Sequence, residues 1–303
     1  MNKPIHDDRV SIVIITRNRG KQIHVALEHL VELPEKPSVI VVDNGSSDTT
    51  PEIARASGKT VQVITLEHNL GCAGRNVGVV RAQTPYVAFS DDDSWWAPGA
   101  LGRAADLFDS NSTLGLIAAK ILVGPDEKLE PLCQVMAMTD LHKNHQCNIG
   151  IPVVGFAACG AIVRREAFLA AGGFQQRLGV GGEEHILALD LLRHGWYLAY
   201  IDEVVAYHHP SPIRDPARRR RLEARNALWS AWLRRPVESV FAETWRIVKQ
   251  SFRDPAYRAG LIEATVGLPW VLSARDPIPS DIDRQVKIAE KVFHAYSSLP
   301  GLN

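Results

Sequence analysis

The first third of the chain alternates between strand-like and helix-like stretches, and this alternation restricts the fold more than any other feature. Residues Val10–Thr16 read VSIVIIT, a β-branched run typical of a strand that is buried on both faces. The next stretch, Lys21–Leu33, places its apolar residues close to the helical period. The pattern then repeats, with strands expected at Ser38–Val42, Val61–Leu66 and Pro85–Ser90, and helices expected from about Asp48 and at Gly74–Ala82.

Repeated strand–helix–strand units predict an α/β fold with a mainly parallel sheet and helices on both faces. In such open sheets, ligands bind at the carboxyl ends of the strands. Three polar segments follow expected strand ends, namely the loop Thr16–Arg19, the residue Asp43 and the triplet Asp91–Asp93. We therefore expect these segments to meet in one crevice, although they lie far apart in the sequence.

The second half of the chain has a different pattern. Further strands are expected at Leu114–Val123, Ala157–Val163 and Tyr197–Tyr207, and helices at Arg165–Ala171 and Glu183–His194. From about Asp215 the chain becomes helical and basic. We therefore expect an α/β domain over residues 8–213, divided at about residue 110 into halves 8–110 and 111–213, and a helical C-terminal extension over residues 214–303.

Composition fits a soluble globular protein, because the 303 residues include 46% hydrophobic and 22% charged residues with a formal net charge of zero. Nothing in this balance favours a nucleic-acid partner. The polar start Met1–Arg9 does not resemble a signal peptide, and the interrupted apolar stretch Ile149–Val163 is too short to cross a bilayer. We expect a cytoplasmic protein with buried, reduced thiols at Cys72, Cys133, Cys147 and Cys159.

The triplet Asp91–Asp93 directly follows an apolar stretch, so a strand would present clustered carboxylates at its end. Such clusters offer oxygen ligands to Mg²⁺ or Mn²⁺, and these metals commonly bridge phosphate oxygens. Taken alone, an acidic triplet is better explained by a turn, because Asp and Ser are common turn residues.

Six segments in a fixed order change this interpretation: VSIVIITRNR at 10–19, VVDNGSSDT at 41–49, NLGCAGRN at 69–76, FSDDD at 89–93, GGEE at 181–184 and the pair His208/His209. Over roughly residues 8–212 this set resembles family 2 of the glycosyltransferases with the GT-A fold. The resemblance implies a Rossmann-like sheet with a nucleotide-sugar-binding half, 8–110, and an acceptor-side half, 111–213. It also implies an inverting transfer from a nucleoside-diphosphate sugar to a hydroxyl group, with Mn²⁺ or Mg²⁺ as cofactor.

By this resemblance, Asp91 and Asp93 occupy the two named positions of the DxD element. Asp93 is expected to bind the metal, and Asp91 to contact the ribose or complete the metal shell. Asp92 is expected to face away or to support the other two, and we include it among the nucleotide-sugar-binding residues. One of His208 and His209 is expected to join the metal or to lie against the diphosphate, with a slight preference for His208. We do not expect both to point into the site, because neighbouring residues of a strand point to opposite faces.

The resemblance also implies a surface for the nucleotide and its diphosphate. Asp43 resembles the aspartate that binds the base, although an Asx-turn is the alternative for an acid at a turn. Two glycines before a helix start allow close backbone approach, and the helix amides favour anions. The expected nucleotide-sugar-binding residues are Thr16, Arg17, Asn18, Arg19, Asp43, Asn69, Gly71, Arg75, Asp91 and Asp92.

The GGEE segment resembles the acidic pair that begins the acceptor-side helix of the family. That pair is usually Glu-Asp and its second acid is the general base, which implies Glu184. Because glutamate reaches one methylene further than aspartate, Glu183 competes for the role. The alternative is a favourable placement of acids in a first helical turn. For Trp95, Trp96 and Gly182 we expect a wall of the sugar or acceptor pocket, with core packing as the alternative for the tryptophans.

The segment Ala217–Arg235 contains seven arginines and one glutamate, together with Trp229 and Trp232. Such a helix permits peripheral binding to anionic lipid at the inner face of a membrane, where a lipid-linked acceptor would be a natural partner. The alternative is a solvated basic face whose tryptophans pack inward. A weaker option has Arg225 and Asn226 closing over the donor phosphates.

The function favoured by these residues is transfer of a sugar from a UDP- or dTDP-sugar to a hydroxyl of a glycan, a lipid-linked molecule or a small molecule. One alternative is a catalytically inactive nucleotide-sugar-binding protein. A sugar nucleotidylyltransferase is less favoured, because it requires a glycine-rich basic loop after the first strand, where this chain has Thr16-Arg17-Asn18-Arg19-Gly20.

Overall fold

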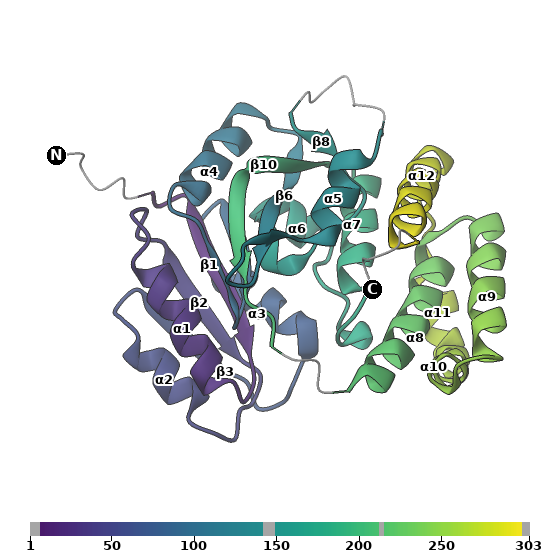
Figure 1. The fold of residues 1–303 in the computed structure, drawn as a ribbon, viewed down its shortest axis with the longest axis horizontal. Coiled ribbons are helices and arrows are strands. Elements are labelled where there is room, and N and C mark those ends of the chain that lie inside the picture. Colours follow the sequence, from purple (N-terminus) through teal and green to yellow (C-terminus); the bar gives the residue numbers. More distant parts are fainter. Residues whose placement is uncertain (1–6, 142–148, 212–214, 299–303) are drawn as a thin grey trace.

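The computed structural model describes residues 7–141, 149–211 and 215–298 (Figure 1). Its strands are β1 (Val10–Thr16), β2 (Ser38–Asp43), β3 (Val61–Thr65), β4 (Tyr86–Asp91), β5 (Ser94–Trp96), β6 (Leu114–Val123), β7 (Lys128–Leu129), β8 (Ile151–Pro152), β9 (Ala161–Arg164) and β10 (Tyr197–His208). They form one sheet in the order β3-β2-β1-β4-β9-β6-β10-β5, with β7 beside β6 and β8 beside β10.

The helices are α1 (Gly20–Val31), α2 (Thr50–Ala56), α3 (Gly74–Arg81), α4 (Ala100–Ser110), α5 (Pro131–Met138), α6 (Arg165–Ala170), α7 (Glu183–Arg193), α8 (Pro216–Arg234), α9 (Val237–Ser251), α10 (Pro255–Val266), α11 (Leu268–Ala274) and α12 (Ser280–Ser297). Figure 1 shows that α8 to α12 gather beside the sheet domain, whereas the earlier helices cover the faces of the sheet. Within the described ranges, no helix is long and apolar enough to cross a membrane.

The strands of the first half run parallel, as expected from the strand–helix alternation. β1 lies between β2 and β4, with Thr16 opposite Asp43 and Ile15 opposite Asp91. The ends of β1, β2 and β4 therefore reach the same edge of the sheet. This register confirms that the polar segments after these strands meet, and the apolar β-branched residues of β1 are buried because helices cover both faces.

The sheet becomes mixed beyond β4. β9 runs antiparallel to both β4 and β6, whereas β6 and β10 pair in parallel. The strand expected at Ala157–Val163 begins only at Ala161, because Ala158–Gly160 form a 3₁₀ turn. β5 was not expected, since three residues are too few to show a strand period.

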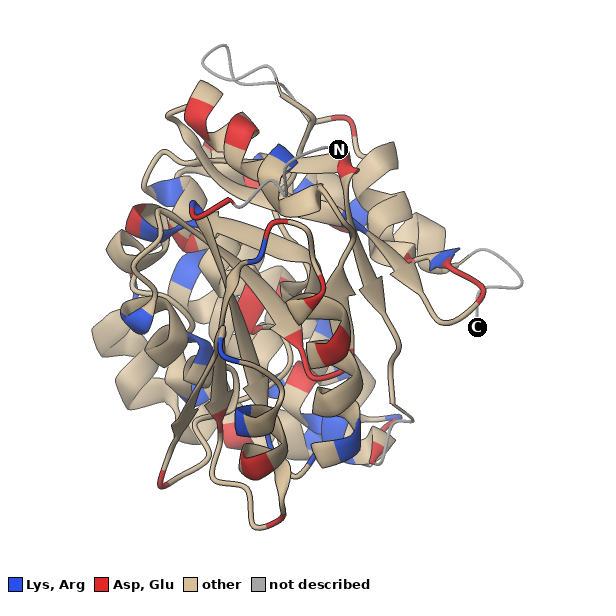
Figure 2. Ribbon diagram, turned by 90° about the vertical axis from the view of Figure 1, so that its left-hand side faces the viewer, with Lys and Arg blue, Asp and Glu red and all other residues tan. Residues whose placement is uncertain are grey.

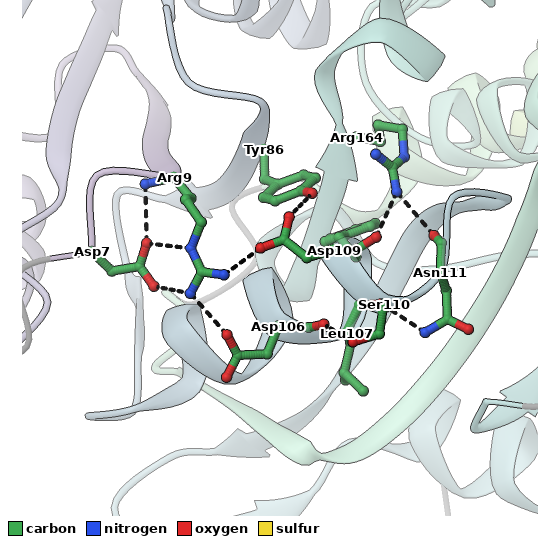
Figure 3. Close-up of polar contacts among 10 residues, drawn as sticks. Asp7, Arg9, Tyr86, Asp106, Leu107, Asp109, Ser110, Asn111 and Arg164 are labelled. Carbon is green, nitrogen blue, oxygen red and sulfur yellow. Dashed lines mark hydrogen bonds and ion pairs between the residues drawn. The ribbon is translucent and has the colours of Figure 1, made fainter.

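A network of ionic contacts fastens α4 to the starts of β1 and β4 (Figure 3). The guanidinium of Arg9 pairs with Asp7, Asp106 and Asp109, and the hydroxyl of Tyr86 donates to Asp109. This network lies at the amino ends of the parallel strands. It therefore stabilises the sheet at the edge opposite the polar loops.

The helical extension has a hydrophobic cluster of its own, to which α7 contributes Ile186 and α8 contributes Leu228 and Trp229. A buried ion pair between Asp190 of α7 and Arg234 of α8 adds a polar contact. The boundary expected near residue 213 lies outside the described residues and stays a prediction.

Charged residues of both signs lie side by side on the face formed by the first half of the chain, as Figure 2 shows.

Cys72, Cys133 and Cys159 are free and buried, as expected, and Cys147 lies outside the described residues.

Candidate active site

The loops that follow the first strands are tied to one another by asparagine side chains. The amide of Asn18 donates to Ser46 Oγ at 2.8 Å, and Asn18 itself has a left-handed backbone with φ of 54°. Asn44 Oδ1 accepts from the amide of Leu70 at 3.1 Å, and its Nδ2 donates to the carbonyl of Gly71 at 3.2 Å. The loops after β1, β2 and β3 therefore form one connected surface.

Asp43 is fully buried at the end of β2. Its carboxylate accepts hydrogen bonds from the amide of Ser46 at 3.2 and 3.3 Å and from the Ser46 hydroxyl. This is the turn-closing role named above as the alternative. A base-binding role for Asp43 stays a prediction, and the base would have to share an oxygen that already accepts from Ser46.

Gly71 joins the first half of the chain to the loop before α7. It has a positive φ of 59°, and a Cβ at this position would lie 2.9 Å from the carbonyl oxygen of Gly179. The next amide, that of Cys72, donates to the same oxygen at 3.0 Å. Only glycine allows this approach without strain. Asn69 supports the turn by accepting from the Gly71 amide at 2.8 Å.

Asp93 lies against His208, the last residue of β10. The nearest carboxylate oxygen is 3.4 Å from His208 Nε2, and the other oxygen accepts from the amide of Ser211 at 3.2 Å. Burial alone would raise the pKa of Asp93, but His208, the Ser211 amide and Arg19 together outweigh burial and hold that pKa below its usual value. Burial alone would lower the pKa of His208, and Asp93 raises it instead. His209 turns the other way, with its ring 4.7 Å from that of Trp95.

Asp92 points toward the loop after β1. It is buried, accepts from the hydroxyl of Thr16 at 2.9 Å and lies 3.8 Å from Arg19 Nε. Burial raises its pKa to about 7, despite the opposing charge of Arg19. Of the two placements expected for Asp92, support of its neighbours fits this geometry. Arg17 of the same loop is exposed.

Arg75 is the buried cation of the site. It forms an ion pair with Asp91, and its guanidinium lies 5.4 Å from the centre of the Phe174 ring. Its charge also acts on Glu183 and Glu184, which begin α7. Its Nε is buried without a hydrogen-bond partner in the described structure, as is Nη1 of Arg19. Both donors are therefore buried and unsatisfied in the described structure.

The two glutamates differ in their surroundings. Glu183 is buried and accepts from the amide of Gly181, so its carboxylate closes the turn that precedes α7. Burial, with repulsion from Glu184, raises the pKa of Glu183 to about 8. Burial also raises the pKa of Glu184, Asp91 adds to this effect, and Arg75 opposes it. Gly182, with φ of 88°, precedes the pair.

Asn226 of α8 supports the turn that precedes α7. It is fully buried, and its Nδ2 donates to the carbonyls of Leu178 at 3.0 Å, Val180 at 3.5 Å and Gly181. Arg225 also donates to the Leu178 carbonyl, at 2.7 Å. The option that these two residues close over the donor phosphates is therefore not what the structure shows. The sequence carried one weak signal for this role, because Asn226 is an amide side chain at a helix position whose neighbours are buried.

Both tryptophans after the triplet pack in the hydrophobic core. Trp96 is 1% exposed, and the ring of Trp95 stacks on that of His29 at 4.1 Å. They line a surface cavity of about 570 Å³ together with His209. The core alternative thus describes their main contacts, and a role against the sugar stays a prediction.

No group of three or more His, Cys, Asp or Glu side chains suited to a metal occurs within residues 7–141, 149–211 and 215–298. Asp93 and His208 form a pair of candidate ligands instead.

A family model described as "Glycosyl transferase family 2" matches residues 11–170, which is more than half of the chain. The chain belongs to glycosyltransferase family 2. An N-acetylglucosaminyl-diphospho-decaprenol L-rhamnosyltransferase of Mycobacterium tuberculosis is 25% identical over 246 residues, covering 69% of this chain and 80% of that protein. A pre-mycofactocin glycosyltransferase of the same species is 30% identical over 223 residues, covering 70% of this chain and 45% of that protein.

Solved structures agree on the fold of this family 2 glycosyltransferase. The mannosyltransferase PcManGT from Pyrobaculum calidifontis, in complex with GDP-Man and Mn²⁺, superposes with a TM-score of 0.57 at 19% identity and covers 99% of this chain and 78% of that one. The GT-A fold and the enzyme class expected from the sequence are therefore confirmed. The family assignment gives no support to the nucleotidylyltransferase alternative.

Proposed function

We propose that this enzyme moves a sugar from a UDP- or dTDP-sugar to an acceptor hydroxyl, with inversion at the anomeric carbon and with the help of Mn²⁺ or Mg²⁺. One observation carries the proposal. Arg75 pairs with Asp91 on the nucleotide-binding side, and its charge acts on Glu183 and Glu184 on the acceptor side. A donor diphosphate and an acceptor hydroxyl would thus meet beside one buried cation.

Glu184 is the proposed general base. Glu183 accepts a hydrogen bond from the amide of Gly181 and so closes the turn before α7. Glu184 is the second acid of the pair, the position that the family resemblance gives to the general base. In a single displacement, the oxygen of the acceptor hydroxyl bonds to the anomeric carbon while Glu184 takes the proton of that hydroxyl. The bond from that carbon to the diphosphate oxygen breaks, and the nucleoside diphosphate leaves. A raised pKa makes Glu184 a better proton acceptor than an exposed glutamate.

The leaving diphosphate needs positive charge. Arg75 Nε and Arg19 Nη1 are buried donors without partners in the described part of the chain, and buried donors normally have one. We propose that the donor diphosphate is bound on the side of the site that carries these two guanidinium groups. Preorganised donors of this kind stabilise the charge that develops as the leaving group departs.

Asp93 and His208 are the proposed metal ligands. A carboxylate and an imidazole suit Mn²⁺, and a carboxylate suits Mg²⁺. Such metals often use only one or two protein ligands and complete their shell with substrate phosphates and water. The pair therefore fits the metal, even though the described residues hold no larger cluster. When bound, the metal would neutralise charge on the diphosphate.

We propose a lipid-linked diphosphate as the acceptor class. Support comes from the rhamnosyltransferase relative, whose name describes a diphospho-decaprenol-linked acceptor. The acceptor side of the site is formed by the loop and helix that carry Glu183 and Glu184.

The test is a panel of sugar nucleotides incubated with the protein and Mn²⁺ or Mg²⁺. We expect release of nucleoside diphosphate from UDP- or dTDP-sugars, slowly onto water and faster with an acceptor, and loss of release with EDTA. Nucleotide binding without any release, with every donor and a lipid-linked acceptor present, would contradict the proposal.

A further inference from the structure

Helix α9 turns its largest apolar side chains outward. Phe241 is 72% exposed, Trp245 is 61% exposed and Phe252, just after the helix, is 81% exposed. With Val237 they form one stripe along the helix, which we name the outer stripe. The buried residues of α9 are Ser239, Ile247 and Ser251. A helix on a globular protein normally shows the opposite arrangement, so the outer stripe needs a partner.

The neighbouring helices also expose apolar side chains. α10 packs against α9, and the two helices α10 and α11 expose Ile262, Val266, Leu268 and Leu272. Figure 1 shows α9 on the outer side of the helical extension, away from the sheet. The outer stripe is therefore accessible to a large partner.

The tryptophans of the basic helix α8 do not take part. Trp229 is buried and donates to the carbonyl of Ala264 at 3.0 Å, and Trp232 donates to Thr244 Oγ1 at 2.9 Å. They pack inward against α10 and α9, which is the alternative named for this helix in the sequence. An aromatic membrane contact through α8 itself is therefore not available.

Basic residues border the outer stripe. The ammonium of Lys249 lies 5.2 Å from the centre of the Trp245 ring, and Arg253 follows Phe252. Glu238 is the acid on the same face. The wider segment 215–275 contains twelve Arg and Lys against six Asp and Glu, whereas the whole chain has no net charge. This part of the molecule is thus attracted to an anionic surface.

We infer that the outer stripe of α9 binds the surface of an anionic lipid bilayer. An aromatic apolar face bordered by Lys and Arg matches the composition of helices that lie in the membrane interface. No described helix could cross the membrane, so the proposed contact is with the membrane surface. A second copy of the chain is the alternative occupant, and the experiment below distinguishes it from a lipid surface.

The inference goes beyond the transfer reaction and is tested on the full chain without an acceptor. The probes are phosphatidylcholine vesicles with and without phosphatidylglycerol, in a co-sedimentation assay. We expect binding to the anionic vesicles, weakened by salt. The variant F241S/W245S/F252S should lose roughly tenfold or more of this binding, because affinity scales with the apolar area that is buried. The matched control V80S/M138S removes exposed apolar side chains from the sheet domain and should bind as the parent does.

Two further variants sharpen the result. K249E/R253E should lose the preference for anionic vesicles while the apolar stripe is intact. W245F should bind normally but lose most of the blue shift in tryptophan emission that vesicles cause in the parent protein. Release of nucleoside diphosphate from the donor should stay unchanged in all these variants, which shows that they are folded.

Either of two results would overturn the inference. The first is equal vesicle binding by the parent and the F241S/W245S/F252S variant. The second is no vesicle binding by the parent. In that second case, concentration-dependent dimerisation that the triple variant abolishes would assign the stripe to a second copy.

Discussion

Arg75 of α3 forms a buried ion pair with Asp91 at the end of β4. This pair connects the aspartate triplet to the acidic start of α7, because the charge of Arg75 also acts on Glu183 and Glu184. The triplet, which in the sequence suggested a metal and nucleotide-sugar site, thus belongs to a larger arrangement. Asp91 meets a guanidinium, Asp92 meets a threonine hydroxyl, and Asp93 meets a histidine.

Replacing Arg75 by methionine should weaken both folding and nucleotide binding. Loss of one partner of a buried ion pair costs about 3–5 kcal/mol, and we expect about 2–3 kcal/mol here because the Asp91 side chain is partly exposed. The comparison is urea denaturation together with nucleoside diphosphate affinity. Arg81→Met, on the exposed side of the same helix, is the control and should change neither. An unchanged affinity in Arg75→Met would remove Arg75 from the diphosphate site.

Asn226→Ala should lower the rate of transfer more than it lowers donor affinity. The change removes the amide that binds three carbonyls of the turn before α7, so the position of Glu184 becomes less defined. Each buried group left unpaired costs about 1–3 kcal/mol. Ser239→Ala is the control, since it also removes a buried hydrogen bond, to Asp283, but far from the turn. We expect it to lower Tm and to leave kcat unchanged. Equal effects of the two variants on kcat would show that Asn226 acts through stability alone.

Glu183→Gln should stabilise the protein increasingly as the pH rises. The pKa of Glu183 lies at about 8 in the folded protein, above its ordinary value of 4.5. Between these values the carboxyl is protonated when folded and ionised when unfolded, so its contribution to stability is complete below pH 4.5 and is lost as pH rises through about 8. Glutamine has no such dependence and can still accept from the Gly181 amide.

The measurement is Tm of both proteins from pH 5 to pH 9, a range chosen about these pKa values. We expect a similar Tm for both proteins at the acidic end and a higher Tm for Glu183→Gln at the alkaline end. The difference corresponds to a few kcal/mol at most in the free energy of unfolding. A constant difference across this range would mean that the pKa of Glu183 is not raised.

His208→Ala should weaken the effect of Mn²⁺ on nucleoside diphosphate binding, whereas His209→Ala should not. The imidazole of His208 contacts the Asp93 carboxylate, whereas the ring of His209 packs against the ring of Trp95. Isothermal titration with and without Mn²⁺ separates the two. Loss of the metal effect in His209→Ala alone would reverse the assignment.

The sequence predicted the donor half of the fold closely because that half follows a single rule. Continuous apolar runs form buried parallel strands, and the bounds of β1 agree with those expected. In the acceptor-side half, the bounds of β6 agree as well. The rule fails where tertiary pairing decides the structure. β5 has three residues and exists because β10 pairs with it. β9 starts later than expected because the preceding residues turn.

The candidate site was predictable where strand ends carry polar residues in family order, as at Asp43 and Asp91–Asp93. The direction of each side chain was not, because partners distant in sequence set it. Asp92 turns to Thr16, and His208 rather than His209 reaches Asp93. Asn226 lies more than forty residues beyond the turn it supports, and no motif links the two.

The most direct test of the account is transfer by Glu184→Gln compared with Glu183→Gln, measured as nucleoside diphosphate release with acceptor present. We predict that Glu184→Gln loses transfer by at least about a hundredfold, as expected when a general base is removed, and retains nucleotide affinity. Glu183→Gln should keep most of its activity. Full transfer by Glu184→Gln with loss in Glu183→Gln would contradict the proposed mechanism and assign the base to Glu183.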